Sequence, residues 1–159
     1  MKRITAYLGT LIVAAYMMGS AIASQVGLKT YSIEADYADV MQDVEDGIVN
    51  AGLNIDYRGN IGEMLDRTGK DVGSTKKVYK GARFLQFCSA RLSRKMMEAD
   101  PLNMGVCPYI IFIYETAAKP GTITVGYKRP LGAKGEASQK ALGDIEALLD
   151  GIVREAADQ

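Results

Sequence analysis

The chain has 159 residues, of which 48% are hydrophobic and 24% charged, so it can form one globular domain and is neither disordered nor fibrous in composition. Without residues 1–23 it would carry 17 basic and 19 acidic groups, a balance that argues against a nucleic-acid binder. It contains no histidine. This absence excludes Ser-His-Asp and Cys-His catalysis, histidine-ligated zinc and histidine-ligated haem. An enzyme would need carboxylate, lysine, tyrosine or thiolate chemistry, and we expect no catalytic residue.

The N-terminal segment has the three parts of a secretory signal peptide. Met1-Lys2-Arg3 is basic, residues 4–18 are mostly apolar, and Gly19-Ser20 precedes the small-residue ending Ala21-Ile22-Ala23. The pattern predicts cleavage between Ala23 and Ser24, with 1–23 as signal peptide and 24–159 as one periplasmic or secreted domain. The alternative is a retained anchor, because residues 4–23 are about long enough to span a bilayer. An uncleaved segment would then be the protein's contact with the membrane.

In chain order, the apolar periodicity first predicts a strand, a helix, a second strand and a short helix. The first helix has Asp36 as its N-cap and Gly52 just beyond its end. A polar, lysine-bearing segment follows and is typical of a solvated loop. The expected bounds of these five segments are 26–35, 37–51, 53–57, 61–67 and 70–80.

The second half predicts a strand, a helix ended by Asp100-Pro101, a hairpin and a last amphipathic helix. The first hairpin strand, 108–115, is apolar on both faces, which indicates a central strand covered on both sides. Pro120-Gly121 forms the turn. The fold class is therefore α+β: one small domain with a mainly antiparallel sheet, helices packed on one face, and the order β-α-β-α-β-α-β-β-α. The other expected bounds are 82–88, 89–99, 122–128 and 138–156.

The two cysteines, Cys88 and Cys107, are first interpreted as a structural disulfide, because paired cysteines in an exported chain are usually bridged. Cys88 ends one predicted strand and Cys107 precedes another. If those strands are antiparallel neighbours, the two residues meet at one edge of the sheet. If they are parallel, the residues lie a strand length apart, about 20 Å, too far for a bridge.

Two other uses of the cysteines stay open. Together with Met96, Met97 and Met104 they could form a soft Cu(I) site, although methionines on an amphipathic helix usually fill a core. Alternatively, Cys88 directly precedes a helix, whose amide dipoles would lower its thiol pKa and make it reactive.

A basic group follows Cys88 on the same helix. Arg91, Arg94 and Lys95 could bind an anion at the helix N-terminus, or they could form a solvated helix face.

Several short motifs together resemble a known family. They are Phe87-Cys88-Ser89-Ala90, the run at 93–101, Cys107-Pro108-Tyr109, Pro120-Gly121 and the run at 125–130. The chain resembles exported bacterial members of the family catalogued as domain of unknown function 302, over about residues 31–152. The resemblance implies a small α+β domain and allows a homodimer, and it implies no established activity.

The sequence thus predicts a periplasmic binding or interaction module with a structural disulfide and no cofactor. Its ligand, a small molecule or a protein, is not specified by any motif. The alternative is a thiol-redox or Cu(I)-handling protein of the cell envelope that uses Cys88 and Cys107.

Overall fold

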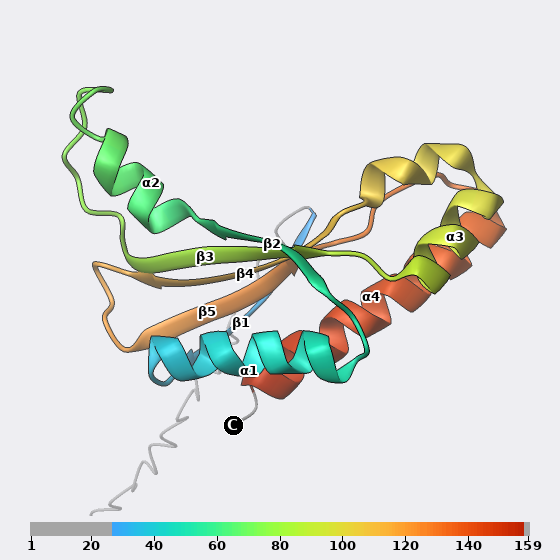
Figure 1. Cartoon of the computed structure of the whole chain (residues 1–159), viewed down its shortest axis with the longest axis horizontal. Helices are drawn as coiled ribbons and strands as arrows, with labels where there is room; N and C mark the ends of the chain where they lie inside the picture. The colour runs from blue at the N-terminus through green and yellow to red at the C-terminus, as the bar shows by residue number, and fades with distance from the viewer. Residues whose placement is uncertain (1–26, 158–159) are drawn as a thin grey trace, which may run out of the picture.

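An antiparallel sheet organises residues 27–157, the part of the chain that the computed structural model describes (Figure 1). Five strands lie in the order β1-β5-β4-β3-β2, and each neighbouring pair is antiparallel. The predicted hairpin and the central position of its first strand, β4, are confirmed. The signal peptide and its cleavage site at Ala23–Ser24 lie outside the described residues. The strands are β1 (Leu28–Glu34), β2 (Ile55–Asn60), β3 (Tyr79–Phe87), β4 (Tyr109–Thr116) and β5 (Thr122–Lys128).

The helices fall where the periodicity predicts them, with one addition. In Figure 1, α1 and α4 lie side by side under the sheet, and α3 continues this layer along α4. The short α2 lies on the other side and packs against β3. A 3-10 helix, η1, connects α3 to β4 and was not predicted. The bounds are α1 (Tyr37–Asn50), α2 (Ile61–Thr68), α3 (Ala90–Ala99), η1 (Pro101–Val106) and α4 (Glu136–Ala157).

Side chains at the helix ends explain where α1 and α3 begin and stop. Asp36 accepts a hydrogen bond from the Ala38 N–H, and Ser89 accepts one from the Leu92 N–H, so each satisfies a free amide of a first turn. Gly52, with φ of +75°, terminates α1 in the left-handed conformation that glycine adopts without strain. None of the helices in the described part of the chain is long and apolar enough to cross a membrane.

The hydrophobic core lies between the sheet and the layer of α1 and α4. Ile111 and Ile113 of β4 are fully buried there, as predicted. They pack in the same cluster as Ile48 of α1 and Ile145 of α4. Burying each of these side chains contributes about 1.5–3 kcal/mol, so this face holds the helices onto the sheet.

The other face of β4 differs from the prediction. Ile110, Phe112 and Tyr114 were expected to be covered, but they are only half-buried. On this face the Phe112 and Tyr114 rings stack on each other: they are nearly parallel, with centroids 6.3 Å apart. Phe112 also requires a neighbour without a side chain, because a Cβ on Gly126 would lie 2.8 Å from its ring. A strand that is apolar on both faces is central here without being covered by helices on both sides.

Candidate functional site

The antiparallel pairing of β3 and β4 brings the two cysteines to the same end of the sheet. Phe87 pairs with Tyr109 at the end of the ladder. Cys88 directly follows Phe87, and Cys107 lies two residues before Tyr109. Of the two pairings that the sequence left open, the antiparallel one is therefore observed.

The predicted disulfide is wrong for this structure, because Cys88 and Cys107 are both free thiols. The register gives the physical reason. Since Phe87 opposes Tyr109, the position opposite Cys88 is Pro108, and Cys107 lies one residue beyond it. The two thiols interact without a covalent bond.

A hydroxyl from α3 completes the site. Ser93 Oγ lies 3.2 Å from the Cys107 sulfur and 3.0 Å from the Tyr109 hydroxyl. The Ser89 cap fixes the start of α3, so Ser93 falls one turn into the helix and reaches the strand end. Tyr109 is itself buried, with its ring edge-on to Phe87 at 5.8 Å. We call Cys88, Cys107, Ser93 and Tyr109 the thiol site.

Partial burial dominates the electrostatics of the thiol site. Burial, and to a lesser extent the neighbouring Cys107 thiol, raise the pKa of Cys88 to about 11, against the lowering effect of hydrogen bonds from the Tyr109 backbone and Ser93. Burial likewise raises the pKa of Tyr109 to about 12. The prediction that the N-terminus of α3 lowers the Cys88 pKa is wrong, because loss of water around the sulfur outweighs the helix dipole. Cys88 is therefore protonated at neutral pH.

The three candidate methionines differ in burial. Met96 is fully buried in the core, and the Met104 side chain is 69% exposed on η1. Met97 is half-buried against the core cluster, and its spacing of four residues from Ser93 puts the two residues on the same side of α3. Within the described residues, no cluster of three or more His, Cys, Asp or Glu side chains could hold a metal ion. A metal here would depend on sulfur ligands.

The basic residues of α3 are exposed, and two of them form ion pairs. Lys95 pairs with Asp144 of α4, and Arg94 pairs with Glu98 one turn along its own helix. Arg91 lines a shallow cleft that also contains Asp144, and its charge helps to lower the pKa of that carboxyl. These contacts favour the alternative interpretation, in which the three basic residues form a solvated helix face with ion pairs.

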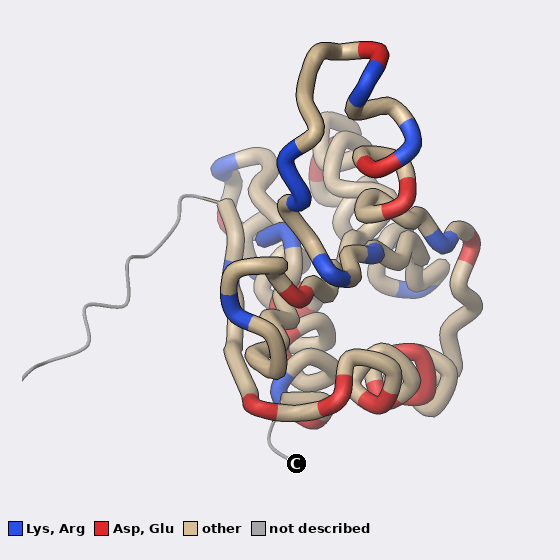
Figure 2. The backbone as a smooth tube through the Cα atoms, turned by 90° about the vertical axis from the view of Figure 1, so that its left-hand side faces the viewer, with Lys and Arg blue, Asp and Glu red and all other residues tan. Residues whose placement is uncertain are grey.

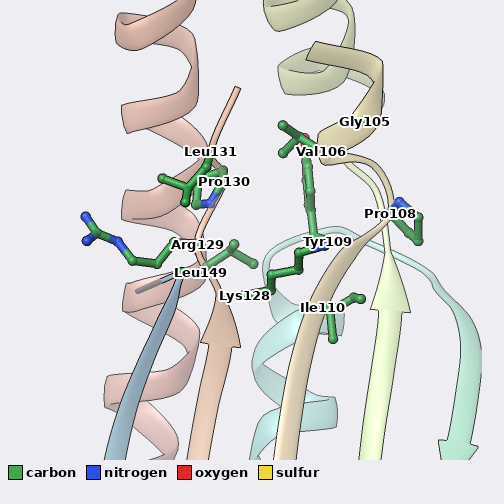
Figure 3. Close-up of a pocket in the computed structure, with 11 residues that line it drawn as sticks. Gly105, Val106, Pro108, Tyr109, Ile110, Lys128, Arg129, Pro130, Leu131 and Leu149 are labelled. Carbon is green, nitrogen blue, oxygen red and sulfur yellow. The ribbon is translucent and has the colours of Figure 1, made fainter. Parts of the chain in front are cut away.

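A small pocket adjoins the thiol site (Figure 3). Its volume is about 100 Å³, and Val106, Pro108 and Tyr109 form one wall, opposite Pro130 and Leu149. The Arg129 side chain points away from it and pairs with Glu146. A space of this size holds about three water molecules, so it suits an ion or a small group and not an organic substrate.

Sequence reasoning missed Ser93, Tyr109 and this pocket. The pocket walls come from η1, the end of β5 and α4, which are far apart in the chain. Two signals in the sequence could have pointed to the residues of the thiol site. Ser93 lies four residues after the Ser89 cap, and Tyr109 directly follows Cys107-Pro108.

Comparison with known proteins defines the family. The family "Domain of unknown function DUF302" matches residues 29–156. A crystal structure of an uncharacterized conserved DUF302 protein from Bacillus stearothermophilus superimposes with a TM-score of 0.67; it is 14% identical, and the match covers 83% of this chain and 99% of that one. At this identity the likeness concerns the fold alone. Comparison with curated proteins gives no significant match. Because the family match extends over most of its length, the chain belongs to the DUF302 family.

Proposed function

We propose that this domain is a small binding module of the cell envelope in which Cys88 and Cys107 together hold one Cu(I) ion. The observation that carries the proposal is the meeting of these two cysteines as free, partly accessible thiols at one strand end. Thiolate and thioether ligands select Cu(I) over harder cations. Met97, one turn beyond Ser93, supplies a thioether as a third ligand.

The surroundings of the thiols support metal binding better than thiol-disulfide exchange. Exchange needs a thiolate that attacks a disulfide, and a Cys88 pKa of about 11 leaves very little thiolate at neutral pH. A bound metal ion, in contrast, displaces the thiol protons itself. The Ser93 hydroxyl, 3.2 Å from the Cys107 sulfur, would act as an outer partner that orients this ligand.

The location in the cell envelope rests on the N-terminal segment. Its basic start, apolar stretch and Ala-Ile-Ala ending support export with cleavage before Ser24. The intact mass of the exported protein should correspond to a chain that begins at Ser24. A mature species that retains Met1 and stays with membranes would contradict this part of the proposal.

Anaerobic competition with a chromophoric Cu(I) chelator tests the metal site. We expect one Cu(I) per chain, and loss of this binding in Cys88→Ser and in Cys107→Ser. Ser93→Ala should weaken binding by about 10-fold, as is typical when an outer partner is removed. Met97→Leu should also weaken it, whereas the matched variant Met104→Leu should not, because Met104 is 69% exposed on η1. If the double cysteine variant binds Cu(I) as the wild type does, the proposal fails.

A further inference from the structure

A second cleft lies at the opposite end of the sheet from the thiol site. It has a volume of about 490 Å³ and lies beyond the end of β4, between the loop that precedes β3 and the β4–β5 hairpin. Tyr114 and Thr116 of β4 and Thr124 of β5 contribute to its lining. Its size falls within the range of small-molecule sites in proteins, about 300–1,000 Å³.

The charged side chains that line this cleft are all cationic. Lys76 and Lys77 come from the loop before β3, and Lys119 comes from the hairpin turn. Lys77 pairs with Asp66 of α2, but neither Lys76 nor Lys119 has an acidic partner within the described part of the chain. Figure 2 looks at this end of the domain, where basic positions lie along the upper loop beside the acidic positions of that loop and of α2.

Besides Asp66, which pairs with Lys77, a second carboxylate touches the lining of the cleft. Glu34 of β1 accepts a hydrogen bond of 2.7 Å from the Thr122 hydroxyl. It does not itself line the cleft. The two unpaired lysines therefore leave the site with a net positive charge, in a protein that is close to neutral overall.

An aromatic surface borders the lysines. The Tyr114 ring lies 5.5 Å from Tyr79 and nearly parallel to Phe112, so these side chains present flat apolar area on a face that no helix buries completely. Threonine hydroxyls beside the ring add neutral hydrogen-bonding groups. Flat rings stack on such a surface, and lysine ammonium groups bind phosphate or carboxylate as point charges.

We infer that this cleft binds a small organic anion in which a flat ring carries a phosphate or carboxylate group. Lys76 and Lys119 contact the anionic group, and Tyr114 contacts the ring. The inference does not depend on the Cu(I) proposal, because the two sites lie at opposite ends of β4 and share no residue.

Calorimetric titration with 1-naphthyl phosphate, 1-naphthol and inorganic phosphate tests the site. We expect saturable binding of naphthyl phosphate, at least about 10-fold tighter than binding of either fragment, because only the complete probe uses both the ring and the lysines. The variant with Lys76→Gln and Lys119→Gln should lose at least about 10-fold in affinity. A matched variant with Lys134→Gln and Lys140→Gln, two exposed lysines outside the cleft, should bind like the wild type.

The ring contact has its own pair of variants. Tyr114→Leu should weaken naphthyl phosphate and leave inorganic phosphate unchanged, whereas Tyr57→Leu removes an exposed ring outside the cleft and should have no effect. If Tyr114→Leu does not fold, the variant with Lys76→Gln and Lys119→Gln still tests the inference. Equal affinity for naphthol and naphthyl phosphate, or unchanged affinity in the Lys76 and Lys119 variant, would overturn the inference. So would a dimer in sedimentation experiments that protects Tyr114 and excludes the probe.

Discussion

Replacing Asn103 by alanine is expected to destabilise the domain strongly. Asn103 lies in η1 and is fully buried, although its side chain is polar. Its amide nitrogen donates to the Met96 carbonyl at 2.8 Å and to the Ser138 hydroxyl at 2.9 Å, and its oxygen accepts from the Ala133 N–H at 2.8 Å. One side chain therefore ties η1 to α3, to the segment before α4 and to α4 itself.

The size of the effect follows from these three hydrogen bonds. Asn103→Ala removes all of them and leaves their partners in a buried space, and each stranded buried group costs about 1–3 kcal/mol. Because water that enters the space can satisfy some of them, we expect a total loss of about 3–5 kcal/mol, a large part of the roughly 5–15 kcal/mol that stabilises a typical domain. The matched control is Leu102→Ala: this neighbour is 74% exposed, so its loss should stay within about 0.5 kcal/mol.

Urea unfolding followed by circular dichroism measures both variants. The midpoint for Asn103→Ala should fall well below that of the wild type, with the slope of the transition unchanged. A loss below about 1 kcal/mol would refute the reasoning, because it would mean that the three hydrogen bonds contribute no more than one ordinary surface contact.

Three further predictions concern the core and two titrating groups. Ile111→Ala should cost about 2–5 kcal/mol in urea unfolding, and a loss under about 1 kcal/mol would contradict the buried position of β4. In Cys107→Ser protein, the pH midpoint for thiolate formation at Cys88, measured by ultraviolet absorbance, should still lie well above the usual pKa of 9.0, because burial is the main cause of the shift. A midpoint at or below 9.0 would contradict this prediction. A hydrogen bond from the Gly121 N–H lowers the pKa of the Glu115 carboxyl below its usual 4.5. The ionised Glu115 therefore stabilises the fold fully above about pH 4.5, and this stabilisation is lost as the pH falls through the lowered pKa of the folded state. Glu115→Gln should reduce this acid sensitivity in thermal unfolding, and an unchanged pH profile would count against it.

The sequence predicts most of the fold because periodicity is a local property. Apolar patterning identifies every strand, by a continuous apolar run in the case of β4, and helical spacing with caps such as Asp36 identifies the four α-helices. The bounds of β2 and β3 were less accurate, because their pairing continues through polar positions, such as Asn60 opposite Arg83. Backbone hydrogen bonds in a ladder do not require apolar side chains.

The features that sequence reasoning missed depend on contacts between distant segments. Whether Ile110 and Phe112 are covered depends on where the helices pack, and periodicity within β4 does not contain that information. The Cys88 pKa depends on how much water the surrounding chain removes, which outweighs the local signal of a helix N-terminus. The disulfide prediction failed because of an offset of one residue between Cys88 and Cys107, which only the register shows.

The most direct test of the central claim is a count of the free thiols in the wild-type protein. The protein is purified from the cell envelope without oxygen or reductant, unfolded with a metal chelator present, alkylated with iodoacetamide and measured as intact mass. Free thiols at Cys88 and Cys107 predict two adducts per chain. A chain that takes up no adduct and is lighter by two hydrogens would contain a disulfide, and that result would contradict the account.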